Sequence, residues 1–583
     1  MPDVGATQRD STKFIVFSQF EKMNTRLARQ SLPESDAAWM ENLQPVGPNN
    51  LVPTPAALTA LATLTVSISS LFFANIGAVD YLIAFRADGG AAWINLSSGA
   101  HMLFAPVGTF AAPDMTVYAS QRILIQDPKA GYSTWDGSVF VTGGGVSPNI
   151  PVTAGGSGFT SPPAVTIGGG SGSGATATAI VSGGAVVSVV LTAPGTAYKS
   201  GDVLTVTFGG PGTGATATAN VWPVSLGTTI AVFAGRVWMA SGRVLTFTGT
   251  AGYDDFDPAN AAGATTIADA DLSHTITGLR NLNNYLYIFG DSSVRQIGSI
   301  SVSSNITLFT PLILASDIGT SFLKTILSYN RLVLFANKNG VYAVFGASVE
   351  KISDDLDGIF GGSSVGGATH SSIDFSLVPS AALNDIRNIH CYLLLVRYVD
   401  PVAGARSIIL VFQEKRWFVV SQGNNLVAIT SAFTAASQQY ETFGSSGADI
   451  TQLLQDAATA VPITLQTALT SHGNPVQAKQ PIRAGVGAVF QGTQTLNFSV
   501  DNENFSRSYV LTDGAQVTWI NNAGGVVTFD SIIWIGRGYR YPFTGVDGSG
   551  KMLGVTITGA VANNIINQVA IEYQDRALWG AAQ

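Results

Sequence analysis

One hairpin-like unit recurs along the chain and constrains its fold more than any other feature. The unit is a turn, an apolar strand, a tight Gly/Asn/Asp turn and a second strand that often ends in glycine. Close copies read Gly235-RVWMASGRVLTFTG, Asn284-YLYIFGDSSVRQIG and Asn330-RLVLFANKNGVYAVFG, and looser copies begin at Asp80, Ser120 and His390. Short apolar runs bounded by Gly, Asn, Asp and Ser are typical of strands and turns, so we predict an all-β chain.

The spacing of the copies indicates how the strands are assembled. Anchored on the first strand, the copies start at Tyr81, Arg122, Arg236, Tyr285, Arg331 and Tyr392, which gives steps of 41, 114, 49, 46 and 61 residues. Propeller blades repeat about every 40 to 50 residues, and a closed ring buries the faces that a single blade leaves open. We therefore expect a β-propeller-like core of about six blades. The alternative is a set of ordinary hairpins in sandwiches or barrels.

The step of 114 residues contains an insertion that its composition reveals. Residues 150–222 are almost pure Gly, Ala, Thr, Val and Ser, and removing these 73 residues reduces the step to 41. The segment is itself a tandem repeat, because Phe159 recurs as Tyr198 and Gly174-ATATA recurs as Gly214-ATATA. Alternating Ala and Thr suit a small β unit. We predict a folded pair of small repeats, the alternative being a flexible Gly/Ser linker.

These patterns divide the chain into five parts. We expect an N-terminal arm with the first strands (1–60), the first blades (61–149), the inserted repeat (150–222), the remaining blades (223–470) and a C-terminal β-sandwich-like domain (471–583). Helix is scarce. Its best candidates are Glu34–Leu43, where Ser31 or Pro33 can start a helix, and Ala448–Thr459.

Composition excludes several classes of protein. Charged residues are 11% of the 583, against roughly 25% in ordinary soluble chains. Disordered chains combine low hydrophobicity with high charge, whereas apolar residues are 46% here. A net charge of −8 disfavours a nucleic-acid binder that works through a basic surface. Two interpretations of the low content of charged residues remain: a membrane protein, or a protein whose surface is largely buried against partners.

The apolar runs do not support the membrane reading. Leu58–Phe73 is too short and too rich in Ser and Thr for a spanning helix, which needs about 20 apolar residues. The polar N-terminus lacks the pattern of a signal peptide, so we expect a protein made in a cytoplasm. The single cysteine, Cys391, excludes an intrachain disulfide and lies in an apolar run, which predicts a buried structural thiol.

Motifs that carry chemistry are few, and we predict that the chain is not an enzyme and needs no cofactor or metal. The five histidines have no metal-ligand spacing. One GxSxG match, Gly362–Gly366 with Ser364 at its centre and His370 nearby, lies in turn-like sequence instead of between a strand and a helix. We nominate no catalytic residue and no ligand-binding residue.

Two acidic clusters are the remaining candidates for a site. Carboxylates at alternating positions supply calcium ligands, and Asp is also a common turn residue. Neither cluster has the downstream Glu of a 12-residue calcium loop, so we interpret both as turns and leave calcium open. Paired carboxylates can also hydrolyse glycosides, but the sequence does not say which acids pair. The clusters are Asp254, Asp255 and Asp257, and Asp354, Asp355 and Asp357.

Several segments resemble tail proteins of short-tailed bacteriophages, in particular the tail nozzle (tail tubular or tail-completion) family. In the N-terminal arm, Leu32-Pro33-Glu34 and Asn42-Leu43-Gln44-Pro45 match that family's phrases, while Val52–Pro55 departs from its Arg-Pro-Gly element. Similar phrases are Phe233–Pro258, Ile276–Gly298 and Ile571–Trp579. The inserted repeats resemble small β repeats found in phage virion proteins. The similarity covers most of the chain at the level of phrases.

The resemblance implies a structural virion protein at the distal end of a short tail, assembled in the host cytoplasm. Such a protein forms a ring, expected to be a hexamer, that encloses the DNA exit channel, retains the genome and opens for ejection. Its partners would be further copies of itself, a tail adaptor ring, tail fibres or spikes, and genomic DNA that passes without tight binding. An acidic, weakly charged ring suits this role because it repels phosphates.

Two other functions remain open from the sequence. One is a carbohydrate-binding or carbohydrate-cleaving propeller of a receptor-recognising tail spike. The other is a different structural piece of a virion, such as a capsid-decorating or fibre-base protein, in which the inserted repeat makes the contacts.

Overall fold

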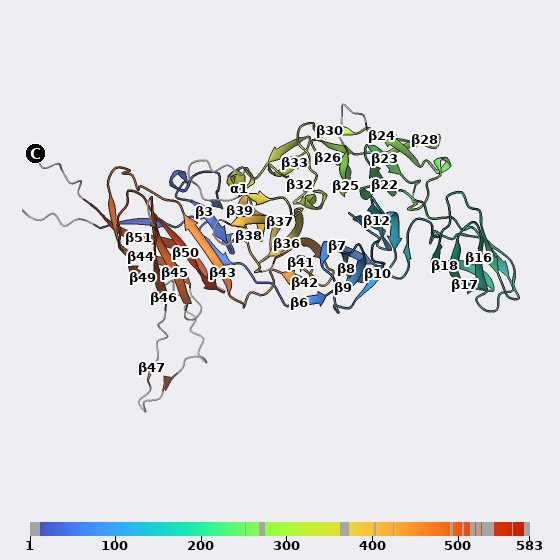
Figure 1. The fold of residues 1–583 in the computed structure, drawn as a ribbon, viewed down its shortest axis with the longest axis horizontal. Helices are drawn as coiled ribbons and strands as arrows, with labels where there is room; N and C mark the ends of the chain where they lie inside the picture. The colour runs from blue at the N-terminus through green and yellow to red at the C-terminus, as the bar shows by residue number, and fades with distance from the viewer. Residues whose placement is uncertain are drawn as a thin grey trace, which may run out of the picture.

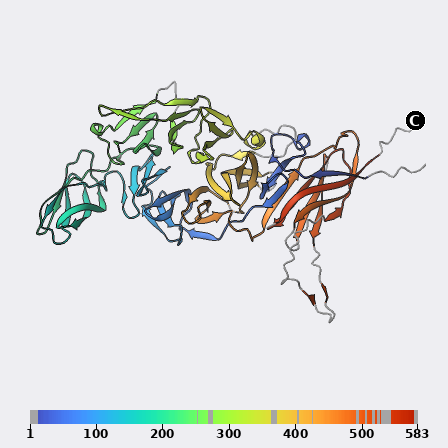
Figure 2. The same cartoon turned by 180° about the vertical axis from the view of Figure 1, so that it is seen from behind.

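The computed structural model describes residues 12–250, 252–267, 275–361, 372–400, 404–423, 425–489, 494–503, 506–513, 519–520, 526–527, 542–562 and 564–576. Three parts follow one another along the long axis: the C-terminal sheets, a ring of small sheets, and the inserted β unit (Figures 1 and 2). Strands dominate throughout. Within the described ranges, the helical elements are single turns: α1 (Asp357–Phe360) and the 3-10 turns η1 (Arg29–Ser31), η2 (Pro258–Asn260), η4 (Leu323–Thr325) and η5 (Asp354–Leu356).

The ring contains six separate four-stranded antiparallel sheets, which we number as blades. Blade 1 is β40 (Ala428–Phe433), β41 (Tyr440–Ser446), β42 (Asp449–Leu453) and β6 (Ala60–Thr63), and blade 2 is β7 (Ile68–Ile76), β8 (Val79–Arg86), β9 (Ala91–Asn95) and β10 (His101–Ala105). Blade 3 is β11 (Asp114–Tyr118), β12 (Arg122–Asp127), β13 (Gly131–Trp135) and β14 (Phe140–Val141), and blade 4 is β21 (Thr229–Phe233), β22 (Arg236–Ser241), β23 (Val244–Phe247) and β24 (Gly263–Thr266).

Blades 5 to 7 complete the ring. Blade 5 is β25 (Ile276–Leu282), β26 (Tyr285–Gly290), β27 (Val294–Ile297) and β30 (Leu312–Ala315), with a separate hairpin of β28 (Ser301–Ser303) and β29 (Ile306–Leu308) before β30. Blade 6 is β31 (Leu327–Tyr329), β32 (Leu332–Asn337), β33 (Gly340–Phe345) and β34 (Ser348–Lys351). Blade 7 is β36 (Ser380–Ile386), β37 (Ile389–Asp400), β38 (Gly404–Gln413) and β39 (Arg416–Val420), and it belongs to an 11-stranded sheet that also contains β35 (Ile373–Asp374).

The same turn opens most blades and explains the recurring sequence unit. Between their first two strands, blades 3 to 7 carry two consecutive residues with positive φ, as at Asn283 (52°) and Asn284 (65°). Two positive φ values define the type I′ turn, whose twist matches that of a hairpin and which favours Asn and Gly. The turn fixes the register of the next strand, so the apolar residues of each hairpin fall on the faces that meet the neighbouring blades.

The core lies between the blades, not within any one of them. Each apolar cluster takes residues from at least two neighbouring units, as where Phe289 of blade 5 packs against Phe335 of blade 6 with ring centroids 5.3 Å apart. Successive clusters join blades 1 and 2, 2 and 3, 3 and 4, 4 and 5, and 5 and 6, and the largest joins 6, 7 and 1. No blade can bury both faces alone, which is the physical reason for ring closure.

The ring closes on a strand from the other end of the sequence. β6 pairs antiparallel with β42, so that Ala62 lies opposite Ile450 and Thr63 opposite Asp449. Ala62 is buried with Phe443 and Ile450 in the cluster between blades 1 and 2. The outermost strand of blade 1 therefore comes from the N-terminal arm.

The insert forms two small sheets between blades 3 and 4. β18 (Ala185–Thr196), β17 (Ser173–Ser182), β16 (Ala164–Gly169) and β19 (Leu204–Phe208) make one, and β15 (Val152–Ser157) with β20 (Thr213–Ala217) makes the other. The two repeats interlock. A Cβ at Gly212 would lie 2.5 Å from the ring of Phe159, and one at Gly172 would lie 2.4 Å from the ring of Tyr198. Each aromatic thus packs on the glycine of the other repeat.

The C-terminal domain is two packed sheets that share strands with the N-terminal arm. One contains β4 (Leu43–Val46), β5 (Asn50–Pro53), β51 (Ile565–Asp575), β44 (Lys479–Val489), β49 (Phe543–Gly545) and β1 (Lys13–Phe17). The other continues blade 7 through β3 (Asp36–Glu41), with β2 (Lys22–Met23) beside it, to β43 (Val461–Thr467), β50 (Leu553–Val561), β45 (Gln494–Asn502) and β46 (Ser506–Asp513). A separate pair is β47 (Trp519–Ile520) and β48 (Val526–Val527).

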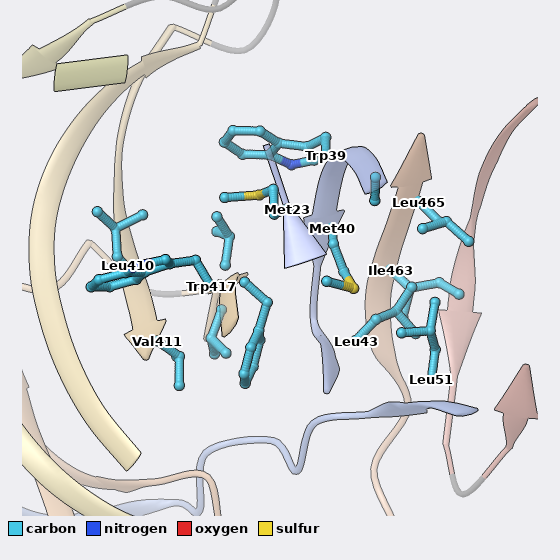
Figure 3. Packing of buried hydrophobic residues seen from close by; sticks show 14 of the residues in the cluster. Met23, Trp39, Met40, Leu43, Leu51, Leu410, Val411, Trp417, Ile463 and Leu465 are labelled. Carbon is cyan, nitrogen blue, oxygen red and sulfur yellow. The ribbon is translucent and has the colours of Figure 1, made fainter. Parts of the chain in front are cut away.

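The junction between the ring and the C-terminal domain is apolar. Figure 3 shows Met40 and Leu43 of the arm between Trp417 of blade 7 on one side and Ile463 and Leu465 of β43 on the other. Arg406 of β38 binds both carboxylate oxygens of Glu41 on β3, at 2.5 and 2.8 Å. A shared sheet, a shared core and an ion pair therefore make blade 7 and the C-terminal sheets one body.

The predicted fold class is confirmed: the chain is all-β, with a propeller-like core, an inserted small β unit and a C-terminal sandwich-like domain. The core has six separate blades and a seventh unit within the large sheet.

The two helix predictions are wrong. Glu34–Leu43 contains β3, all of whose six residues are buried, and Ala448–Thr459 contains β42. A strand that is buried on both faces lacks the alternation of apolar and polar residues, so its sequence cannot be distinguished from that of a buried helix. The described residues contain no helix of the length and apolarity that a membrane crossing requires.

The closure by β6 generates a prediction. Ala62→Asp places an unpaired charge in the cluster between blades 1 and 2 and is expected to lower the free energy of unfolding by more than about 3 kcal/mol. Ala60→Asp is the matched control, because Ala60 lies on the same strand and is exposed. Thermal unfolding together with limited proteolysis measures both. Equal effects of the two substitutions would contradict the closure.

Candidate functional site

The candidates from sequence are not brought together by the fold. Ser364 and His370 lie outside the described residues. His390, on β37 of blade 7, donates a hydrogen bond from Nδ1 to the carboxylate of Asp385 at 2.6 Å. Its ring stacks on that of Tyr329 in blade 6, with ring centroids 5.2 Å apart. The other oxygen of Asp385 accepts the backbone N–H of Tyr440 in blade 1 at 2.7 Å. This group therefore fastens three blades together.

The first acidic cluster is occupied by hydrogen bonds within the protein. Asp254 accepts from Ser147 at 2.5 Å and Asn149 at 3.4 Å, and burial raises its pKa. Asp255 accepts from Asn260 at 2.9 Å, while Asp257 caps η2 by accepting from the N–H of Ala259 at 2.9 Å. These carboxylates shape the turn that follows β23, as their interpretation as turn residues predicts.

The carboxylates of the second acidic cluster are also bound within the protein, here by ion pairs. Asp355 pairs with Lys22 of the N-terminal arm at 2.9 Å, and Asp357 pairs with Lys351. Within the described ranges, no three His, Cys, Asp or Glu side chains are grouped so that they could hold a metal ion. The second cluster thus connects blade 6 to the arm.

Cys391 is buried at the start of β37. Its thiol donates to the carbonyl of Ile389 at 3.2 Å, and burial raises its pKa to about 12. Because the thiolate is the nucleophilic form, this cysteine is unreactive at neutral pH. It contributes to the apolar cluster between blades 6, 7 and 1.

A buried polar cluster lies at the inner strands of the ring of blades. It was not predicted from the sequence. Asp114 begins β11 in blade 3, and its side chain is 1% exposed. Its oxygens accept two hydrogen bonds from Arg280 of blade 5, both at 3.0 Å, and one from Thr229 of blade 4 at 2.7 Å. Thr229 in turn accepts the N–H of Leu279 at 2.9 Å. One buried carboxylate thus links three consecutive blades.

Lys324 stands beside this cluster on η4 of blade 6. Its ammonium lies 5.8 Å from the ring centroid of Phe72 in blade 2, so the side chain crosses the inside of the ring. Burial lowers the pKa of Lys324 to about 8. The Asp114 carboxylate raises this pKa, and the Arg280 guanidinium lowers it. Among the described residues, no hydrogen bond or ion pair to the ammonium is found.

The segment around η4 is held rigidly, which keeps Lys324 in place. The hydroxyl of Thr320 donates to the carbonyl of Ala336 at 2.5 Å, and the hydroxyl of Tyr392 donates to the carbonyl of Thr325 at 2.9 Å. Phe322 stacks on Phe375 at 5.5 Å. The inner cluster therefore contains two cations and one fully hydrogen-bonded carboxylate. The Asp114 carboxylate is held by its hydrogen bonds, and burial brings the pKa of the Lys324 amine down to about 8.

Two grooves lie away from this cluster. The larger, of about 710 Å³, separates β24 from the β28–β29 hairpin and is lined by Gly263–Ile267 and Asn305–Pro311. The second, of about 400 Å³, lies between blades 1 and 2, and there Asp80 and Glu441 share a lining with amide and hydroxyl side chains. Asp80 accepts a hydrogen bond from Asn75 at 2.7 Å. This pair of acids in one groove was also not singled out from the sequence.

Comparisons with known proteins give one kind of similarity. No protein-family model matches the chain, and no curated protein matches its sequence. Among solved structures, the WD40 β-propeller domain of Doa1 is 6% identical, with a TM-score of 0.30, and the match covers 69% of this chain and 97% of that one. The C-terminal WD40 domain of Sif2 is 9% identical, with a TM-score of 0.30, over 69% of this chain and 99% of that one. The blade assignment above follows from the strand pairing itself.

Lys324 generates a pH prediction. Because its folded-state pKa of about 8 lies below the ordinary 10.5, the unfolded chain holds the proton more tightly, and stability rises with pH between these values. Lys324→Met is expected to raise the free energy of unfolding at pH 7 by up to about 3 kcal/mol, at about 1.4 kcal/mol for each unit of pKa. The gain should shrink between pH 8 and 10.5.

The measurement is the thermal midpoint of both proteins across that pH range. Lys338→Met is the control, because Lys338 is exposed. A gain from Lys324→Met that does not change with pH would mean that the ammonium is not the cause.

Proposed function

We propose that the chain is a structural virion protein that forms the distal nozzle ring of a short bacteriophage tail. The ring would enclose the DNA exit channel, retain the genome and open for ejection. The observation that carries this proposal is the resemblance of Phe233–Pro258 and Ile276–Gly298 to the nozzle family. Phe233–Pro258 contains the second and third strands of blade 4, and Ile276–Gly298 contains the first three strands of blade 5. The resembling arm, Asn24–Pro55, contains β3, β4 and β5.

The low charge supports a subunit with large contacts. Interface cores are depleted of charged residues, and charged residues are 11% of this chain. Several of the charges that exist are used inside the subunit, as in Asp114 with Arg280 and Glu41 with Arg406. The charges of these two pairs are satisfied within the subunit and need no partner across a contact between copies.

The sign of the charge supports a channel that releases DNA. Each chain carries a net charge of −8, and a ring multiplies it. DNA-binding affinity depends on Lys and Arg that neutralise phosphates, so an acidic ring disfavours tight binding. The partners of this proposal are further copies in a hexamer, an adaptor ring, and fibres or spikes.

The proposal predicts the shape of the assembly. Electron microscopy of the concentrated protein, and of tails from the particle that contains it, should show closed rings of uniform order with a central opening. Double-stranded DNA should not be retained on the rings at physiological salt, because each copy carries a net charge of −8 and so repels phosphates. A monodisperse monomer that is absent from tails would contradict the proposal, and mass spectrometry of dissected heads and tails separates it from a capsid-decorating role.

A carbohydrate-active propeller is the second candidate, because Asp80 and Glu441 line one groove. Two carboxylates that flank a glycosidic bond are the usual machinery of its hydrolysis. If this function holds, Asp80→Asn and Glu441→Gln should each reduce the release of reducing ends from host polysaccharide by at least about 100-fold. Glu350→Gln, outside that groove, is the control. No release by the wild-type protein would exclude the cleaving activity.

A further inference from the structure

The outer edge of blade 2 presents an exposed apolar patch. β10 pairs with β9 and has no other partner among the described strands. Met102 and Val107 are each 61% exposed, and Leu103 is 43% exposed. We call these three residues the β10 edge. A strand with one free side and apolar side chains is a template for association.

A larger apolar patch lies on the outer side of blade 5. Its residues lie on the β28–β29 hairpin and on β30, and their exposed fractions run from 49 to 60%: Val302, Ile306, Leu308, Leu312 and Ile313. We call them the β28–β30 edge. A two-stranded hairpin is only marginally stable in water by itself, and the described strands include no third partner for this one. Both facts indicate that the hairpin is covered in the assembled protein.

The two edges lie on opposite sides of the ring of blades. In Figure 1, β10 lies along the lower border of the molecule, and β28 and β30 lie along the upper border. Both borders run beside the long axis that joins the C-terminal sheets to the insert. Copies stacked through these two edges would therefore lie side by side with their long axes alongside one another.

Charges next to the edges are complementary. Lys129 is exposed and donates to the carbonyl of Gly108, beside Val107. Asp317 is exposed and follows β30 by two residues. A cation borders one edge and an anion the other, so unlike edges attract and like edges repel.

We propose that the β10 edge of one copy binds the β28–β30 edge of the next copy, and that this heterologous contact builds the ring. The inference rests on the proposed function and names the surface through which it operates. Two different patches on opposite sides of one subunit generate a ring when the rotation between copies closes. A single self-complementary patch would give a dimer instead. The occupant of each apolar edge is thus a second copy of this chain.

Two substitutions test the contact from either side. Met102→Glu and Leu308→Glu each place a negative charge in the centre of one apolar edge and leave the other edge intact. Each variant alone is expected to be a monomer at concentrations where the wild-type protein forms rings. Val203→Glu in the insert and Val378→Glu, at 80% and 55% exposure, are the matched controls and should still form rings. Analytical ultracentrifugation gives the masses, and circular dichroism establishes that every variant is folded.

Mixing the two variants distinguishes the kinds of contact. One unaltered pair of edges remains in the mixture and the two altered edges repel each other, so equal amounts of Met102→Glu and Leu308→Glu should give a 1:1 dimer that grows no further. Dimers of either variant alone would overturn the heterologous contact in favour of a self-complementary one. Rings formed by either variant as readily as by the wild type would overturn the interface and leave the proposed function standing. Wild-type protein that forms no ring at any concentration, and none in tails, would overturn both.

Discussion

The structure depends on the pairing of the N-terminal arm with strands made at the end of the chain. β1 pairs with β51, β3 with β39 and β43, and β6 with β42. The arm therefore supplies the closing strand of blade 1, the bridge from blade 7 and an edge of the C-terminal domain. Neither the ring nor the sandwich is complete before both ends of the sequence are present. Contacts so distant in sequence are costly to form in loop entropy, so the arm couples the folding of the two parts.

The same arm makes the ring and the C-terminal domain mechanically continuous. Blade 7 and the C-terminal strands lie in one 11-stranded sheet, joined where Glu41 of β3 lies beside Val419 of β39. At the far end of β3, Arg29 pairs with Asp501 of β45 at 2.7 Å and donates to the carbonyl of Val555 at 2.9 Å. A load applied to the C-terminal sheets is therefore carried to blade 7 through hydrogen-bonded strands and buried ion pairs. The insert connects to the ring through two chain segments, an apolar contact and separate hydrogen bonds, such as that from the Trp222 indole to the carbonyl of Tyr132 at 2.8 Å.

The sequence predicted the parts of the fold that local chemistry determines. Hairpins with a two-residue turn of positive φ, such as Asn283–Asn284, have a visible signature. Blade 1 lacks it, because Thr434–Gln439 joins β40 to β41 by a longer loop and β6 comes from elsewhere. The helix predicted at Glu34–Leu43 is the strand β3, because full burial removes the alternation that marks a strand. The Asp114–Arg280 pair spans 166 residues, and Lys324 is a single cation in an apolar segment. Asp114, Arg280 and Lys324 come close to one another only when the ring of blades closes.

The placement of charge links the interior of the subunit to its surface. Carboxylates and guanidinium groups that pair inside the ring, such as Asp114 with Arg280, are costly to bury and are retained where they fasten blades to one another. The outer strands of blades 2 and 5, in contrast, carry exposed Met, Leu, Ile and Val. An isolated propeller gains nothing from apolar outer edges, because its closure already buries the faces of its blades. Such edges lower the free energy only if another surface covers them, and their positions on opposite sides favour a surface that repeats around a ring.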